Sequence, residues 1–259
     1  MKSTDPDAEV LLRRLVVGQR EALGRDLVGS YVFGSWVTGD FDPGVSDVDT
    51  VAVLRDDLTE MQFASLERLH RDIVEEAPQW EDRIDVVYMS TRAVETFRTY
   101  SSPAARISPG LWFHAMMVDR RWLIDWYQLR EVGEAMYGPP AKTVVPPISH
   151  EGYVHAVREH LVDWPDSVDG LGQGSQAYAV LTLCRGLRTL RTGEYVSKRE
   201  AARWGAEVMP EHAQLIRDAL AWRDRSRTHP QGDGVDTREA TSRFIADVKH
   251  MVDRGEGQP

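Results

Sequence analysis

An apolar segment that ends in a Gly-Ser turn, followed by one that opens with Asp-x-Asp, constrains this chain more than any other feature. The first segment, 31–33, runs into Gly34 and Ser35, and the second, 49–54, opens with Asp49 two residues after Asp47. Residues two apart on a β-strand point to the same face of the sheet. The pattern therefore predicts two strands whose paired carboxylates project together where the second strand begins.

A third carboxylate and the Gly-Ser turn indicate what this acidic pair does. Asp85 lies in a β-branched run at 83–89, where a third strand is expected. Neighbouring carboxylates repel unless a cation lies between them, and hard oxygen ligands suit Mg²⁺ bound together with substrate phosphates. Gly34 lets backbone approach a phosphate closely, and the N–H groups of the following turn favour an anion. An Asp-x-Asp pair alone is more often turn chemistry, but the combination favours a nucleotide–metal site.

These motifs resemble the signature of the nucleotidyltransferase superfamily that includes DNA polymerase β: Gly-Ser, then Asp-x-Asp, then a third acidic residue. Beyond the signature, the stretches 178–187 and 192–204 are similar to a helix, a Thr-Gly turn and a Lys-bearing helix of the aminoglycoside 3″/9-O-adenylyltransferases, the streptomycin and spectinomycin resistance enzymes. This resemblance extends over nearly the full length. It implies an ATP-dependent enzyme that transfers AMP to a hydroxyl of a small cationic antibiotic.

The resemblance also implies which residues bind the nucleotide. The three aspartates would hold two Mg²⁺ ions, and Asp85 would accept the proton of the acceptor hydroxyl. The family usually has Glu at this position, so the reach of the shorter Asp85 is open. The C-terminal domain would complete the ATP site, which places the active site between two domains. The nucleotide-binding residues implied are Gly34, Ser35, Ser46, Arg185 and Lys198.

Lys198 also breaks a local rule. It follows Ser197, the expected cap of a helix, and a cation in a first helical turn opposes the helix dipole. A bound phosphate would reverse that sign, whereas the alternative is a solvated surface lysine.

The acceptor site is implied by two tryptophans and an aspartate. Trp164 and Asp169 are five residues apart, as are the streptomycin-binding Trp and Asp of the family, and Trp112 matches another family pocket position. An indole face and a carboxylate suit a cationic sugar through cation–π contact and charge-assisted hydrogen bonds. The alternative is that both tryptophans pack against the core.

The periodicity predicts two domains. Strands at about 29–33, 49–54 and 83–89 are separated by helical patterns at 7–23 and 59–76, which indicates an α+β N-terminal domain, 1–142, with a mixed β-sheet. Four prolines between 138 and 147 interrupt any helix there. The C-terminal domain, 143–259, is expected to be an all-α helical bundle with helices at about 151–162, 176–192, 198–207, 210–226 and 237–253.

Composition narrows the partners and the compartment. The formal net charge of −10 argues against general nucleic-acid binding and suits a cationic small substrate. Segment 1–7 is polar with no signal-peptide pattern after it, and no apolar run reaches the ~18–20 residues of a membrane span. The single cysteine, Cys184, is expected to be a buried thiol in a reducing compartment. We therefore expect a cytoplasmic protein. Our separate prediction for its oligomeric state is a monomer.

Three alternatives remain open at this stage. The same chemistry could act on a lincosamide or another metabolite. A nucleotidyltransferase of the toxin–antitoxin type could instead modify a protein or tRNA, although the acidic composition disfavours it. A non-catalytic nucleotide-binding module would need no complete acidic triad, so the presence of Asp47, Asp49 and Asp85 disfavours that interpretation most.

Overall fold

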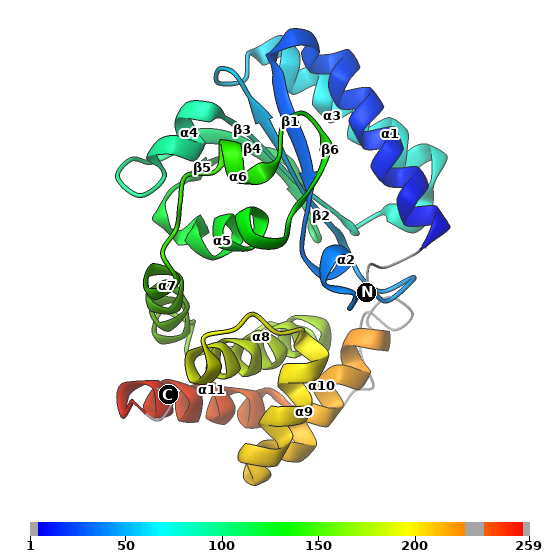
Figure 1. Cartoon of the computed structure of the whole chain (residues 1–259). Helices are drawn as coiled ribbons and strands as arrows, with labels where there is room; N and C mark the ends of the chain where they lie inside the picture. Colours follow the sequence, from blue (N-terminus) through cyan, green and yellow to red (C-terminus); the bar gives the residue numbers. More distant parts are fainter. Residues whose placement is uncertain (1–4, 226–235, 256–259) are drawn as a thin grey trace. The chain divides into compact units, whose positions relative to one another are not determined.

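The chain divides into two units in the computed structural model, Met1–Ile148 and Ser149–Pro259 (Figure 1). The structure describes residues 5–225 and 236–255; the first four residues of the polar N-terminal segment lie outside them. The sequence placed the boundary at 142/143, which falls inside the short helix α6 (Ala141–Val144). The difference has a packing reason, because Ala141 and Val145 are buried in a core of unit 1.

Unit 1 is built on a mixed six-stranded sheet with the strand order β5-β4-β3-β2-β1-β6. The central pair, β2 and β3, is parallel, and every other neighbouring pair is antiparallel. The α+β prediction is confirmed. The strands are β1 (Leu27–Val32), β2 (Val48–Leu54), β3 (Ile84–Ser90), β4 (Ser102–Ser108), β5 (Leu111–Val118) and β6 (Glu134–Tyr137).

Helices cover both faces of this sheet. One face carries α1 (Pro6–Leu23) and α3 (Glu60–Glu76), and the other carries α4 (Thr91–Thr96), α5 (Leu123–Val132) and α6. Alternation along β2 separates the two cores: Val48 and Ala52 pack on the α1/α3 side, and Val51 packs on the α4–α6 side. Asp49 shares the parity of Val51, so it belongs to the α4–α6 side of the sheet.

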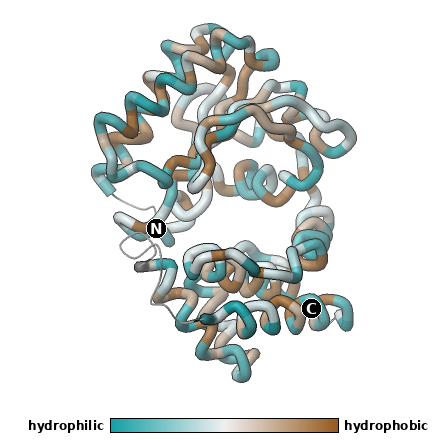
Figure 2. Tube along the Cα trace, turned by 180° about the vertical axis from the view of Figure 1, so that it is seen from behind, coloured by the Kyte–Doolittle hydropathy of each residue, from teal (hydrophilic) through white to brown (hydrophobic). Residues whose placement is uncertain are grey.

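The two long helices of unit 1 begin where the sequence expects. Asp5 caps α1 by accepting a hydrogen bond from the Ala8 amide, and Pro6 occupies the first turn, where no N–H is needed. Thr59 and Gln62 form a reciprocal capping box at the start of α3. Hydrophobic and hydrophilic residues alternate along α1, as expected of a helix that packs on a sheet through one side (Figure 2).

Unit 2 is an all-α bundle, as predicted, in which α8 is the central helix and contacts the other four. Buried residues lie on most sides of α8, and Gly193 ends the helix in the left-handed conformation that favours glycine. None of the described helices is long and apolar enough to cross a membrane. The helices are α7 (His150–Val162), α8 (Gln173–Thr192), α9 (Lys198–Val208), α10 (Ala213–Arg225) and α11 (Arg238–Asp253).

Candidate active site

Three carboxylates meet where β2 and β3 begin. Asp49 and Asp85 are register partners on these parallel strands, and Asp47 immediately precedes β2. One carboxylate oxygen from each residue lies within 4.8 Å of those of the other two. The parallel pairing brings Asp85 beside the Asp-x-Asp pair, because equivalent ends of parallel strands lie at the same edge of a sheet.

The Gly-Ser turn lies directly against this triad. Gly34 has a φ of 66° and caps the four-residue helix α2 (Ser35–Thr38). A Cβ atom at Gly34 would lie 2.0 Å from Oδ2 of Asp49, so both the backbone angle and the close approach require glycine. The Ser35 hydroxyl is buried and has no hydrogen-bond partner among the described residues. An unsatisfied buried hydroxyl on the residue after Gly34 fits a polar ligand that supplies the missing bond.

Arg83 holds the loop that delivers Asp47, and the sequence analysis assigned it no role. Its Nε and one terminal nitrogen donate to the carbonyl of Ser46 at 3.0 and 2.8 Å. The guanidinium lies 4.3 Å from the centroid of the Trp80 ring. Ser46, an expected nucleotide contact, accepts a hydrogen bond at its hydroxyl from the Asp42 amide. Burial lowers the pKa of Arg83, and the negative charge of Asp47 opposes that shift.

Arg106 pairs with Asp85 and was also missed. From the neighbouring strand β4, its Nε donates to Oδ1 at 2.9 Å and a terminal nitrogen donates to Oδ2 at 2.6 Å. The guanidinium also lies 5.0 Å from the ring centroid of Trp122, which stacks on Trp126. A signal was available: Arg106 stands inside the apolar run 104–107 of a strand, where a charged side chain needs a partner.

The charge balance at Asp85 has opposing contributions. Burial raises the pKa of the Asp85 carboxyl above its ordinary value, and the nearby charge of Asp47 adds to this rise. The hydrogen bonds and positive charge of Arg106 lower the same pKa. The two hydrogen bonds from the Arg106 guanidinium therefore orient the Asp85 carboxylate, and burial increases the affinity of that carboxylate for a proton.

The nucleotide-binding residues expected in unit 2 lie on neighbouring elements of the bundle. Arg185 on α8 lies 5.5 Å from the ring centroid of Tyr195, and its terminal nitrogen donates to that hydroxyl at 3.3 Å. Lys198 is the first residue of α9, which Ser197 caps. The Lys198 ammonium lies 4.7 Å from the ring centroid of Tyr178 on α8.

The acceptor-binding candidates are less uniform. Trp164 lies just beyond α7, with its ring 6.0 Å from that of Tyr178 and 5.2 Å from that of His160. Asp169 is exposed in the loop before α8. Trp112 on β5 of unit 1 is 42% exposed and lines a cavity of about 230 Å³. The cavity is not lined by Asp47, Asp49 or Asp85.

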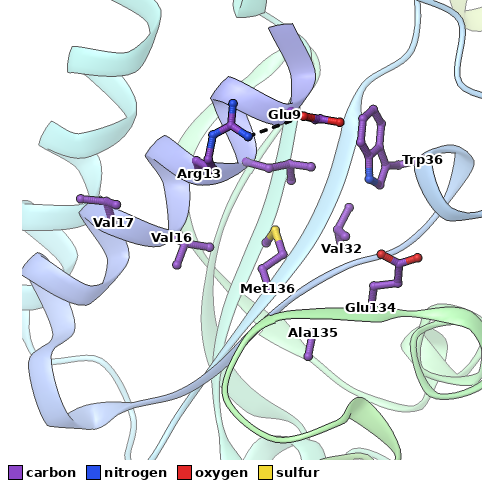
Figure 3. A pocket seen from close by; sticks show the side chains of 10 residues that line it. Glu9, Arg13, Val16, Val17, Val32, Trp36, Glu134, Ala135 and Met136 are labelled. Atoms are coloured by element: carbon purple, nitrogen blue, oxygen red, sulfur yellow. Dashed lines mark ion pairs between the residues drawn. The ribbon is translucent and has the colours of Figure 1, made fainter. Parts of the chain in front are cut away.

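A larger cavity, of about 460 Å³, lies among α1, β1, α2 and β6 (Figure 3). Its wall is mainly apolar, and Trp36 reaches it from α2 directly after Ser35. The charged groups Glu9 and Arg13 pair with each other at 3.5 Å on α1. None of the predicted site residues lines this cavity, so the cavity is not the predicted triphosphate site.

A mixed sheet that brings three carboxylates together beside a Gly-Ser turn defines a nucleotidyltransferase. The comparisons with known proteins agree. The "Nucleotidyltransferase domain" family matches residues 17–106, which include the triad, and the "Aminoglycoside adenylyltransferase, C-terminal domain" family matches residues 143–247. The chain belongs to the aminoglycoside adenylyltransferase family and is an enzyme of the nucleotidyltransferase class.

Individual relatives extend over most of the chain. A spectinomycin 9-adenylyltransferase of Staphylococcus aureus is 24% identical, across 90% of this chain and 89% of the relative. One from Enterococcus faecalis is 25% identical across 76% of this chain and 80% of the relative. A solved Enterococcus spectinomycin adenyltransferase, crystallised with ATP and spectinomycin, matches with a TM-score of 0.72 and 20% identity, covering 95% of this chain and 99% of that one. The structural match shows that the fold is shared.

Proposed function

We propose that this chain is an ATP- and Mg²⁺-dependent O-adenylyltransferase that acts on an aminoglycoside or aminocyclitol such as spectinomycin or streptomycin. It transfers AMP to one hydroxyl of the acceptor and releases pyrophosphate. The observation that carries the proposal is the triad of Asp47, Asp49 and Asp85 beside Gly34. Family membership and the spectinomycin-adenylylating relatives support the choice of acceptor class.

The triad fits a divalent cation. Three carboxylates within 4.8 Å of one another repel, and hard oxygen donors suit Mg²⁺. Asp47, Asp49 and Asp85 would hold the metal, with two ions expected. When bound, Mg²⁺ neutralises charge on the triphosphate and on the departing pyrophosphate. The close approach of Gly34 to Asp49 and the unsatisfied Ser35 hydroxyl support a place for the β- and γ-phosphates at this turn.

Asp85 would accept the proton of the acceptor hydroxyl. The hydroxyl oxygen forms a bond to the α-phosphorus, the bond from that phosphorus to the pyrophosphate oxygen breaks, and the hydroxyl proton passes to the carboxylate. Each oxygen of Asp85 accepts one hydrogen bond from Arg106 and retains a further lone pair. Burial raises the pKa of this carboxyl, which favours proton acceptance.

Unit 2 would supply cations for the nucleotide and aromatic rings for the acceptor. Arg185 and Lys198 would contact the phosphates of ATP, a role that rests on the family resemblance and on the position of Lys198 at a helix N-terminus. Trp164, Asp169 and Trp112 would bind the cationic acceptor. The partially exposed rings of Trp164 and Tyr178 support this assignment for unit 2.

Pyrophosphate release with ATP and Mg²⁺ tests the proposal. The acceptors are spectinomycin, streptomycin, kanamycin, lincomycin and none, and Asp47→Asn is the inactive control. Release with spectinomycin or streptomycin that disappears in the control is the expected result. Release with lincomycin alone would move the chemistry to a lincosamide. Release with no member of the panel would overturn the resistance function and direct the search to a protein, RNA or other metabolite acceptor.

A further inference from the structure

Tyr178 touches both ligand-binding groups proposed for unit 2, although neither the motifs nor the family resemblance singled it out. On one side its ring lies 4.7 Å from the Lys198 ammonium, a proposed nucleotide contact. It also lies 6.0 Å from the ring of Trp164, a proposed acceptor contact, at an interplanar angle of 33°. One side chain on α8 therefore connects residues from α9 and from the end of α7.

The exposure of Tyr178 separates a binding role from ordinary packing. Its side chain is 54% exposed, whereas its neighbours Ala177 and Ala179 on the same helix are buried. A half-exposed aromatic ring contributes little to the core of the bundle. It does present a π-face to cations in solution, and a cation already lies against it.

Lys198 has an electrostatic reason to move when a nucleotide binds. It is the first residue of the 11-residue helix α9, where the helix dipole disfavours a cation and favours an anion. A triphosphate at this end would attract the ammonium far more strongly than a neutral ring does, because charge-assisted hydrogen bonds to phosphate exceed an exposed cation–π contact. Turning Lys198 to phosphate would expose the ring face that it covers.

A cationic acceptor competes with Lys198 for the same ring. An ammonium or guanidinium group placed on the Tyr178–Trp164 pair would meet a like charge while Lys198 lies 4.7 Å from the Tyr178 centroid. With Lys198 engaged on phosphate, the pair is available and the local positive charge is compensated. The ammonium of Lys198 thus occupies the kind of position that a cationic group of the acceptor would take.

Resting on the proposed function, we propose that Tyr178 is a specificity-determining residue that couples the two substrates. Its ring holds Lys198 in the absence of nucleotide and binds a cationic group of the acceptor once Lys198 has turned to the triphosphate. The coupling is reciprocal, because a change in acceptor affinity caused by nucleotide must equal the change in nucleotide affinity caused by acceptor.

Two substitutions at position 178 distinguish the effect of the aromatic ring from the effect of side-chain volume. Tyr178→Leu removes the π-face and keeps apolar volume, whereas Tyr178→Phe keeps the face and loses only the hydroxyl. Tyr100→Leu is the matched control, because Tyr100 is 69% exposed in unit 1. Calorimetry on the full chain measures the affinity for α,β-methylene-ATP with Mg²⁺, and the affinity for spectinomycin and streptomycin with and without that analogue.

The expected result is an opposite shift for the two ligands. Tyr178→Leu should bind the nucleotide analogue about two- to fivefold more tightly, because the ring no longer competes with phosphate for Lys198. It should bind the acceptor about two- to thirtyfold more weakly in the presence of the analogue. The gain in acceptor affinity caused by the analogue should shrink by at most the smaller of these two factors, because Lys198 and the acceptor compete for one ring. Tyr178→Phe and Tyr100→Leu should match the wild type in all three measurements.

Failure of this inference is distinguishable from failure of the proposed function. Wild-type protein that binds the analogue but neither acceptor would overturn both, and it is seen before any variant is made. Wild-type protein that binds both ligands, with Tyr178→Leu matching it in both affinities, would overturn the coupling role alone. Equal losses in Tyr178→Leu and Tyr178→Phe would assign the effect to the hydroxyl and contradict the ring exchange.

Discussion

The two units position their candidate residues in different ways. In unit 1, backbone geometry fixes the site: strand register pairs Asp49 with Asp85, and Gly34 approaches Asp49 so closely that no side chain fits. In unit 2, the candidates are spread over α8, the first residue of α9 and the segment between α7 and α8, and side chains contact one another, as Lys198 lies on Tyr178. Under the proposed function, unit 1 would fix the chemistry, and unit 2 would supply most of the side chains that select the acceptor, because side-chain contacts change more easily than strand register.

The largest expected effect is at the centre of unit 1. Asp85→Asn should lower turnover by about 10²- to 10⁴-fold, because the amide cannot accept the hydroxyl proton, and ATP affinity should change by less than a few fold. Pyrophosphate release and calorimetry measure the two quantities. Asp82→Asn is the control, since Asp82 is exposed and accepts a hydrogen bond from Gly110. Turnover of Asp85→Asn within a few fold of wild type would show that another group is the base.

Arg106 tests whether the fixed geometry of unit 1 depends on its partners. Arg106→Gln should lower kcat by about tenfold and the free energy of unfolding by about 1–3 kcal/mol, since it leaves a partly buried carboxylate without its cation. Arg106→Lys should recover only part of kcat, because a lysine lacks the planar fork. Arg121→Gln is the control: this arginine pairs with Asp119 through a side chain that is 79% exposed. Equal effects at positions 106 and 121 would remove Arg106 from the site.

A buried histidine gives unit 1 a pH-dependent stability. His70 lies in the core with its Nε2 2.9 Å from the Tyr88 hydroxyl, and burial lowers its pKa from 6.5 to about 3. The unfolded chain therefore binds a proton below pH 6.5 that the folded chain does not. Stability is fully present above pH 6.5 and falls by up to about 1.4 kcal/mol per pH unit as the pH drops toward 3. In His70→Gln, this contribution to the pH dependence of the free energy of unfolding should disappear. Denaturant titrations at pH 7, 6 and 5 measure that dependence for both proteins. The same dependence in wild type and His70→Gln would contradict the assignment.

The smallest expected effect concerns the adaptable side chains of unit 2. Trp164→Leu should raise the KM for the acceptor by about three- to tenfold and leave kcat within twofold, because a cation–π contact is lost while the triad is untouched. Steady-state kinetics at saturating ATP separate the two constants. A fall in kcat with an unchanged KM would place Trp164 in the chemistry and weaken the contrast between the units.

The sequence predicted the elements whose signals are local. The helical periods in 7–23 and 59–76 and the aspartates at the start of β2 were enough to place α1, α3 and the acidic site. Strands β4, β5 and β6 were not predicted, since exposed and buried residues along β5 do not alternate regularly. Their absence from the prediction explains why Arg106 was missed: its role depends on the pairing of β4 with β3, a long-range contact.

The residues of unit 2 illustrate the opposite limit. Lys198 was found because a lysine in a first helical turn breaks a local rule, but Tyr178 carries no local signal. It becomes notable only when three helices bring Trp164, Tyr178 and Lys198 together. Sequence patterns therefore indicate single residues with unusual positions, whereas the packing of helices is needed to show which of them share one surface.

The most direct test of the central claim is the identity of the product formed from ATP, Mg²⁺ and spectinomycin or streptomycin. Mass spectrometry of the acceptor, with pyrophosphate measured in the same reaction, reports which phosphorus is attacked. The account predicts an acceptor that carries AMP, one pyrophosphate for each molecule modified, and neither product with Asp49→Asn. An acceptor that carries a single phosphate, with ADP as the second product, would contradict nucleotidyl transfer at the aspartate triad.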